Sequence, residues 1–240
     1  TVSASLTEAV HSMHPALPVA QIEDCPLDEA LRAPDPARVA KLRADYNLGE
    51  RRAIVYTGNL EGYQGIDLLL DAYALVARAR ADAVLVLVGG SPQQIAKVRD
   101  RAAQLDIGER VVLAGQRPAE EMPEWMALGD MLVSPRLHGS NTPLKLFSYM
   151  WSAVAIVATD LPTHTQVLSA AEAVLRPATA EGLAGGMLDV LRDPAHFASL
   201  GAAARARVAR DYSREAFRRK LLAAYDLIGA GARSSVATSM

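Results

Sequence analysis

Short apolar runs alternate with longer amphipathic stretches along the chain from about residue 51 onward. The runs are apolar at nearly every position rather than at every second one, which is typical of parallel strands covered on both faces. Six such runs occur, at residues 53–56, 83–88, 111–113, 131–133, 155–158 and 173–175. The pattern therefore predicts an α/β fold with a six-stranded parallel sheet.

The stretches between these runs have the spacing of helices. After the first run, apolar residues recur on one helical face, at Leu69, Ala72, Tyr73 and Val76. Residues 91–94 offer an N-cap serine, a proline and a capping-box glutamine, and Asp193-Pro194 and Thr142-Pro143 are similar starts. Alternating strands and helices predict a doubly wound, Rossmann-like sheet with right-handed crossovers.

The two ends of the chain differ from this regular part. Residues 1–35 begin with a stretch that could form a helix or the broken end of a larger element, and a proline-rich linker follows. The regular domain is expected to span residues 36–230, with a last helix that ends near Ile228. Residues 231–240 are small and polar, which predicts a disordered tail.

Composition and charge exclude several classes of function. Half of the 240 residues are hydrophobic and 22% are charged, so the chain can bury a sizeable core. Lys plus Arg is 25 and Asp plus Glu is 27, and the formal net charge of −2 argues against a dedicated nucleic-acid binder. A single cysteine, Cys25, excludes an internal disulfide and favours a reducing compartment. No apolar run approaches the ~20 residues that a membrane helix needs.

The loop that follows the first predicted strand is rich in glycine. It runs from Gly58 to Gly65 and contains Asn59 and Gln64. In open parallel sheets, ligands bind beyond the carboxyl ends of the strands, and glycines let backbone N–H groups approach a ligand closely. The spacing matches neither the dinucleotide fingerprint nor a P-loop, and a flexible connector explains the loop equally well.

A second loop, residues 136–145, follows the fourth predicted strand and leads into a predicted helix. Free N–H groups and the positive end of the helix dipole would face this loop. Arg136 and Lys145 add two cations, and hydrogen-bonding groups come from Ser140, Asn141 and Thr142. Together these features predict a cradle for a diphosphate. The alternative is a capped helix whose lysine is solvated.

Other catalytic and metal-binding patterns are missing from the sequence. No HExxH, EF-hand or Asp-x-Asp pattern occurs, so no metal site is predicted. No GxSxG elbow is present, so a triad hydrolase has no visible nucleophile.

Several motifs stand in an order that resembles a known family. They are Tyr56-Thr57-Gly58-Asn59, residues 63–69, Leu87-Val88-Gly89-Gly90, Pro135-Arg136-Leu137-His138-Gly139, residues 141–147 and Ile156-Val157-Ala158-Thr159. The order and spacing resemble the C-terminal domain of family-four retaining glycosyltransferases with the GT-B fold, from roughly residue 19 to 228. In that family this half binds the sugar nucleotide, an N-terminal half binds the acceptor, and the last helix crosses back.

The resemblance implies roles for particular residues. The loop at Gly58 would face the donor diphosphate, residues 115–118 would hold the base largely through backbone groups, and residues 141–143 would present a helix N-terminus to the phosphates. The donor-binding residues predicted on this basis are Gly58, Asn59, Gln64, Gly65, Gly115, Arg117, Arg136, Asn141, Thr142, Lys145 and Ser148.

The chain also departs from the family pattern. Asn59 and Gln64 stand where many relatives carry an Arg and a Lys that clamp the diphosphate. Ser140 and Ser148 stand where the family has two glutamates, so no catalytic residue is assigned. Arg136 and Lys145 could supply the displaced positive charge. Ala153 aligns with a glycine that often follows the helix.

The resemblance further implies a substrate, a partner and a location. The substrate would be a UDP- or GDP-sugar, with no metal or other cofactor. Residues 1–35 would be a remnant of the N-terminal lobe and the interdomain linker, and the missing lobe would act in cis or as a separate chain. We expect a cytoplasmic protein, peripheral at the inner face of the membrane if the missing lobe contacts lipid.

Three functions remain open at this stage. The first is the donor-binding half of a retaining glycosyltransferase, with negligible transfer by this chain alone because the acceptor is not positioned. The second is a non-catalytic, degenerate lobe that serves as a scaffold or regulatory subunit. The third is a sugar-nucleotide epimerase.

Overall fold

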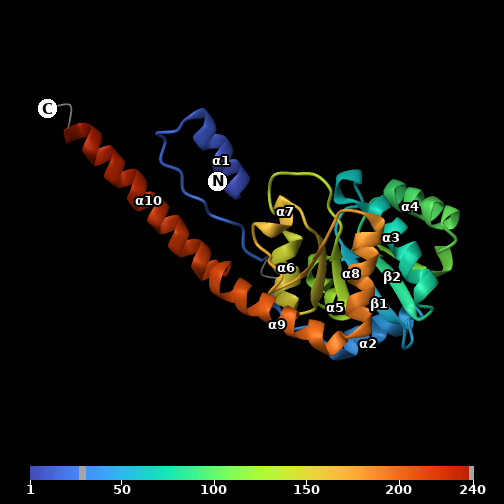
Figure 1. Ribbon diagram of the computed structural model, residues 1–240. Coiled ribbons are helices and arrows are strands. Elements are labelled where there is room, and N and C mark those ends of the chain that lie inside the picture. Colours follow the sequence, from blue (N-terminus) through green and yellow to red (C-terminus); the bar gives the residue numbers. More distant parts are fainter. Residues whose placement is uncertain (27–30, 238–240) are drawn as a thin grey trace.

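The computed structural model describes residues 1–26 and 31–237, with side chains as far as residue 227, and contains one six-stranded parallel sheet (Figure 1). The strands are β1 (Arg52–Thr57), β2 (Ala83–Val88), β3 (Val111–Gly115), β4 (Met131–Ser134), β5 (Ala155–Thr159) and β6 (Val174–Arg176). Each strand coincides with one of the apolar runs, so the predicted sheet is confirmed. The strand order is β3-β2-β1-β4-β5-β6.

Helices connect the strands and extend the chain at both ends. They are α1 (Ala4–Met13), α2 (Pro36–Asp45), α3 (Ile66–Ala79), α4 (Pro92–Gln104), α5 (Met122–Ala127), α6 (Lys145–Ser152), α7 (Pro162–Thr165), α8 (Ala180–Arg192), α9 (Pro194–Asp211) and α10 (Arg214–Ala237). Short 3-10 turns are η2 (Gly62–Gln64), η3 (Gly108–Arg110) and η4 (Ala119–Glu121).

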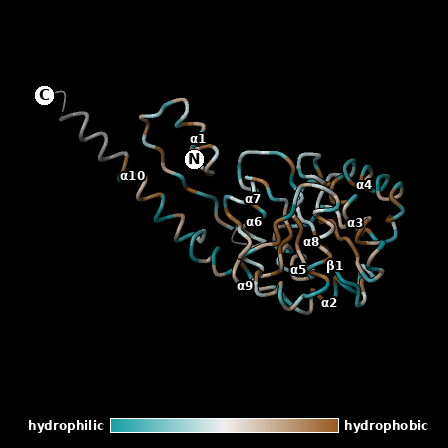
Figure 2. Tube along the Cα trace, in the orientation of Figure 1, coloured by the Kyte–Doolittle hydropathy of each residue, from teal (hydrophilic) through white to brown (hydrophobic). Residues whose placement is uncertain are grey.

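Helices cover both faces of the sheet, which explains the nearly continuous apolar runs. Alternate residues of β1 point to opposite faces: Ile54 and Tyr56 pack into a core with α3, α4 and α8. Ala53 and Val55 pack into a second core with α5, α6 and α9. Figure 2 shows the apolar residues gathered in the body that holds the sheet. The doubly wound, Rossmann-like architecture is thereby confirmed.

Local capping signals set the start of two helices where the sequence placed them. At α4, the Ser91 side chain accepts a hydrogen bond from the Gln94 N–H, and the Gln94 side chain accepts one from the Ser91 N–H, which completes a capping box. At α9, Asp193 accepts from the His196 N–H and Pro194 occupies the first helical position.

The N-terminal segment packs beside the body and beside α10 (Figure 1). At the start of α1, the Ser3 and Ser5 hydroxyls both donate to the carbonyl of Ser140, at 3.1 and 2.5 Å. Farther along the segment, Lys220 of α10 forms an ion pair with Glu23. Residues 1–26 are therefore attached to the sheet domain at two separate places.

Helix α10 is longer than the sequence suggested. It was expected to end near Ile228, but it continues to Ala237, so the predicted tail is helical over residues 231–237. Gly229 and Gly231 weaken this part of the helix by about 1 kcal/mol each, yet no proline stops it. Residues 238–240 lie outside the described residues. In the described part of the chain, no helix combines the length and the apolar character needed to cross a bilayer.

Candidate functional site

Three loops meet at the carboxyl edge of the sheet, where the strand order changes direction. β1 lies between β2 and β4, so the chain runs outward from β1 on one side and from β4 on the other. The crevice above such a switch point is the usual ligand site in open α/β sheets. The sequence pattern singled out the loops that follow β1 and β4, and the family resemblance added the loop that follows β3.

The loops after β1 and β4 are in direct contact. The Leu137 N–H donates to the carbonyl of Tyr63 at 3.1 Å. Gly65 has φ of 76°, and a Cβ there would lie 1.9 Å from the carbonyl oxygen of Pro135. Because no side chain fits that space, Gly65 holds the two loops together by close backbone packing.

Lys145, the first residue of α6, points its side chain into this contact. Its Nζ lies 3.9 Å from the centroid of the Tyr56 ring. A Cβ at Gly58 would lie 3.2 Å from that Nζ, so Gly58 leaves the room that the lysine occupies. Burial, and secondly the nearby charge of Arg136, hold the pKa of Lys145 well below its usual value. The structure thus brings Gly58 and Lys145, two of the predicted donor-binding residues, together.

Three predicted donor-binding residues carry buried polar atoms that have no hydrogen-bond partner within the described part of the chain. The atoms are Gln64 Oε1, Thr142 Oγ1 and Lys145 Nζ. A buried polar group without a partner costs about 1–3 kcal/mol, so such atoms are rare unless a ligand or water completes them. Phosphate oxygens would accept from the lysine and the threonine, and a ligand hydroxyl would donate to the glutamine.

Arg136 lies at the same place, but part of its side chain already makes hydrogen bonds within its own loop. It is 8% exposed. Its Nε donates to the carbonyl of His138 at 2.7 Å, and its Nη2 donates to Asn141 Oδ1 at 3.2 Å. Its guanidinium also lies 5.3 Å from the centroid of the Tyr63 ring. Arg136 and Asn141 therefore shape the loop and add positive charge, and fewer of their donors are free than the sequence suggested.

The start of α6 differs from the prediction. The helix begins at Lys145, its N-cap position is Leu144, and no side chain caps it. The N–H groups of Leu146 and Phe147 donate to the carbonyls of Pro143 and Leu144, at 2.9 and 3.2 Å. Thr142 is thus not the N-cap, because the chain makes a tight turn at Pro143 first. The N-terminus of the helix is therefore displaced from Thr142 to Lys145.

A pocket of about 550 Å³ connects the loops after β1, β2 and β3. It is lined by Gly58, Asn59, Val88, Gly89, Gly90, Ser91, Gln94, Gln116, Arg117 and Met122. A Cβ at Gly89 would lie 2.1 Å from the Gly58 carbonyl oxygen, so the floor of the pocket requires glycine. None of these described lining residues is acidic. The volume of the pocket lies in the range that is usual for small-molecule sites.

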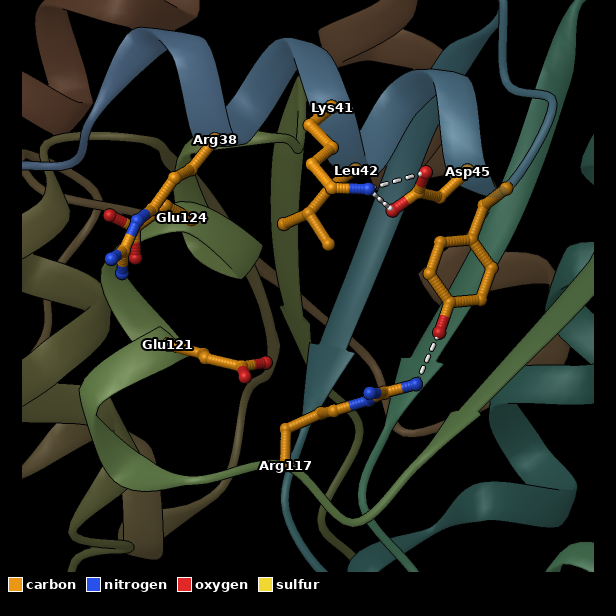
Figure 3. A pocket seen from close by; sticks show the side chains of 8 residues that line it. Arg38, Lys41, Leu42, Asp45, Arg117, Glu121 and Glu124 are labelled. Carbon is orange, nitrogen blue, oxygen red and sulfur yellow. Dashed lines mark hydrogen bonds and ion pairs between the residues drawn. The ribbon is translucent and has the colours of Figure 1, made fainter.

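The Arg117 side chain turns toward a different groove, between α2 and α5 (Figure 3). Its Nε donates to the Ala114 carbonyl at 3.0 Å, its Nη2 donates to the Tyr46 hydroxyl, and its guanidinium lies 5.7 Å from the Trp125 ring centroid. The groove also holds the ion pair of Lys41 with Asp45, at 2.8 Å. Arg117 borders both cavities, and its role in base binding through the backbone stays a prediction.

The two serines that replace the family glutamates lie in different surroundings. Ser140 is exposed, and its carbonyl is used by the hydroxyls of α1. Ser148 is half-buried in α6, one turn after Lys145 and therefore on the same side of the helix. Neither position offers a carboxylate to a donor sugar or a ribose.

A buried histidine, which no sequence pattern indicates, lies beneath the candidate site. His164 of α7 has an Nε2 that lies 2.8 Å from the Ser134 hydroxyl and an Nδ1 that lies 2.8 Å from the Thr159 carbonyl. The Thr159 hydroxyl donates to the Arg136 carbonyl at 2.7 Å. Burial lowers the pKa of His164 to about 4, and the positive charge of Arg136 adds to this. The network ties β4, β5 and the Arg136 loop together.

Two further buried atoms without partners in the described residues lie in or next to α7. They are Thr163 Oγ1 and Gln166 Nε2. Their place just after the carboxyl end of β5 is the signal by which the sequence could have indicated them. No group of three His, Cys, Asp or Glu side chains that could hold a metal ion occurs within residues 1–26 and 31–237.

Comparison with known proteins identifies the family. The model of the family "Glycosyl transferases group 1" matches residues 51–193, more than half of the chain. A GDP-mannose-dependent α-(1-6)-phosphatidylinositol monomannoside mannosyltransferase of Mycolicibacterium smegmatis is 28% identical over 198 residues, which are 78% of this chain and 52% of that protein. The chain therefore spans about half the length of that relative.

Solved structures share the fold. Anabaena HepE, crystallised with UDP and glucose, superposes with a TM-score of 0.80 at 16% identity, over 94% of this chain and 62% of that chain. The C-terminal domain of LpcC from Francisella tularensis superposes with a TM-score of 0.64 at 16% identity, over 78% of this chain and 99% of that chain. The chain belongs to the group 1 glycosyltransferase family, and it has the fold of the C-terminal domain of a GT-B enzyme.

Proposed function

We propose that this chain is the donor-binding lobe of a retaining glycosyltransferase that uses a nucleoside diphosphate sugar. The observation that carries the proposal is the group of buried atoms on Gln64, Thr142 and Lys145, at the switch point of the sheet, that have no partner among the described residues. The names of the relatives add support, since one is a GDP-mannose-dependent mannosyltransferase. Another, 27% identical over 108 residues, is the α-D-kanosaminyltransferase of Streptomyces kanamyceticus.

The charges at the site suit a diphosphate leaving group. Lys145 and Arg136 bring two basic side chains to the loop contact, and no acidic side chain lines the adjacent pocket among the described residues. Sugar transfer leaves negative charge on the departing nucleoside diphosphate, and fixed cations stabilise that charge most where water is excluded. The nucleoside would lie in the pocket floored by Gly89 and Gly90. No residue is assigned to the chemistry at the sugar itself.

A titration with nucleotide sugars tests the proposal. GDP-mannose and UDP-glucose are titrated calorimetrically into the chain and into a Lys145→Ala variant. Loss of a charged hydrogen bond costs about 1.5–3 kcal/mol, so the affinity of the variant should fall roughly 10- to 100-fold. Lys97→Ala is the matched control, because Lys97 is an exposed residue of α4. Failure of the wild-type chain to bind either nucleotide sugar would count against the proposal.

A second candidate is a non-catalytic lobe that acts as a scaffold or regulatory subunit. It is favoured by Ser140 and Ser148, which replace both glutamates of the family pattern. A Ser148→Glu variant separates the two candidates, because a decayed ribose site should bind nucleotide more tightly when the carboxylate returns. Sugar transfer by a complex of the wild-type chain with an N-terminal lobe would exclude the scaffold.

A further inference from the structure

The amine of Lys145 lies where a positive charge is poorly stabilised. Its Nζ is buried without a hydrogen-bond partner in the described part of the chain. The face of the Tyr56 ring, 3.9 Å away, is its nearest favourable contact. The charge that acts on it most is that of Arg136, which has the same sign. An ammonium ion placed there has lost its water and gained no anion in exchange.

The titratable groups that face the amine from the neighbouring elements do not supply it with an anion. On β1 the pKa of Tyr56 is raised by burial, and on α6 burial raises the pKa of Tyr149 to about 12, so both phenols are neutral. On α7 the pKa of His164 is about 4, so its ring is neutral as well. The loop after β4 contributes the permanent charge of Arg136. Near neutral pH, none of these described groups is an anion.

We propose, building on the donor-binding function, that the protein takes up a proton at Lys145 when a nucleotide sugar binds. In the free protein the side chain is a neutral amine. The diphosphate diester brings two negative charges, and the amine accepts one proton from solvent to become the ammonium ion that pairs with them. The diester phosphates stay ionised at neutral pH, so the diphosphate itself gains and loses no proton.

A lysine suits this role better than an arginine. A guanidinium keeps its charge in any surroundings, whereas an amine loses its charge when it is buried without an anion. A site that stands empty part of the time can thus keep Lys145 neutral next to the charged Arg136. The proton then arrives together with the counter-charge that stabilises it.

Proton linkage fixes the sign of the pH dependence. Binding that takes up a proton weakens as the pH rises from the pKa of the free amine to that of the bound ammonium, by about tenfold per pH unit for a single proton. Below the pKa of the free amine the affinity is independent of this group. The wild-type affinity should therefore fall as the solution becomes more alkaline.

Calorimetry measures the proton directly. Titration of the chain with GDP-mannose and with UDP-glucose is repeated, at one pH, in buffers that differ in ionisation enthalpy. The slope of the observed enthalpy against buffer enthalpy gives the number of protons taken up, and we expect about one per nucleotide sugar bound. A wild-type chain that binds with zero slope would overturn the inference and leave the proposed function standing. A chain that binds neither nucleotide sugar would overturn both.

Two variants attribute the proton to Lys145. Lys145→Arg keeps a permanent charge, so it should bind with a slope near zero and with an affinity that no longer falls with pH. Lys145→Met removes the amine, so its weaker binding should also have zero slope; melting curves of both variants establish that they fold. Lys97→Met, on the exposed face of α4, should retain the wild-type slope. A slope that persists in Lys145→Met assigns the proton elsewhere and overturns the inference.

Discussion

The polar residues in the small buried volume beneath the site depend on one another for their hydrogen bonds. His164 accepts and donates hydrogen bonds that join Ser134 to Thr159, and Thr159 in turn holds the carbonyl of Arg136. In the neutral imidazole one ring nitrogen donates to the Thr159 carbonyl and the other accepts from the Ser134 hydroxyl. Protonation would replace the acceptor with a second donor and place a charge beside Lys145 and Arg136.

This dependence predicts an acid-sensitive contribution of His164 to stability. The ordinary pKa is 6.5, and the folded value is about 4, so the unfolded chain binds the proton first as the pH falls. The stabilisation is complete above pH 6.5 and is lost progressively down to about pH 4, by about 3 kcal/mol in total. Urea denaturation across this range, with wild type and His164→Gln compared at each pH, measures it.

The difference in unfolding free energy between wild type and His164→Gln separates the contribution of His164 from that of other groups that titrate in the same pH range. The carboxyls of Glu23 and Glu172 have lowered pKa values, and they affect both proteins equally. His11→Gln, at an exposed position of α1, should follow the wild-type curve. Parallel curves for wild type and His164→Gln between neutral pH and about pH 4 would contradict the assignment.

At the level of elements, the strands were predictable and the contacts at their ends were not. A strand covered on both faces must be apolar at almost every position, so Ala53 to Tyr56 could be recognised without any neighbour. The burial of Lys145 depends on where Tyr56 and Gly58 lie relative to α6, which no local pattern specifies. His164 was missed for the same reason, since its partners come from β4 and β5.

The start and the end of α6 show the limits of local signals. Thr142-Pro143 has the composition of a helix start, but the turn at Pro143 delays the helix to Lys145. At the other end, Ala153 is in the left-handed conformation, with φ of 62°. A glycine is the usual residue at such a position, and it is the residue that the family pattern carries there.

A glycine at position 153 is therefore expected to stabilise the protein. Relief of left-handed strain is worth about 1–2 kcal/mol, and the added freedom of the unfolded chain removes about 0.5–1 kcal/mol of that gain. Ala153→Gly should thus raise the free energy of unfolding by roughly 0.5–1 kcal/mol. Ala79→Gly, at an exposed helical position of α3, is the matched control and should lower it. A loss of stability in Ala153→Gly, measured by urea denaturation, would contradict the claim that the backbone is strained at Ala153.

At the scale of the whole molecule, the described residues form one α/β lobe with a helical segment at each end. α10 leaves the body of the sheet and carries exposed apolar side chains, among them Leu222, Tyr225 and Leu227. The candidate donor site lies at the carboxyl edge of the sheet, bordered by the loop whose Ser140 carbonyl contacts α1. The sequence could indicate the division between the sheet domain and the N-terminal segment, because the strand pattern begins only after residue 51.

The lobe should bind a nucleotide sugar without transferring it. Holding the acceptor alcohol against the donor supplies about 7–11 kcal/mol of the barrier reduction in reactions between two bound molecules, and binding the donor alone does not provide that term. We expect the chain, incubated with GDP-mannose or UDP-glucose and a simple alcohol acceptor, to yield no glycoside above the level without protein. Mass spectrometry detects the product, and calorimetry on the same sample establishes that the nucleotide sugar is bound. Glycoside formed by the chain alone, and lost in Lys145→Ala, would show that one lobe positions the acceptor as well as the donor.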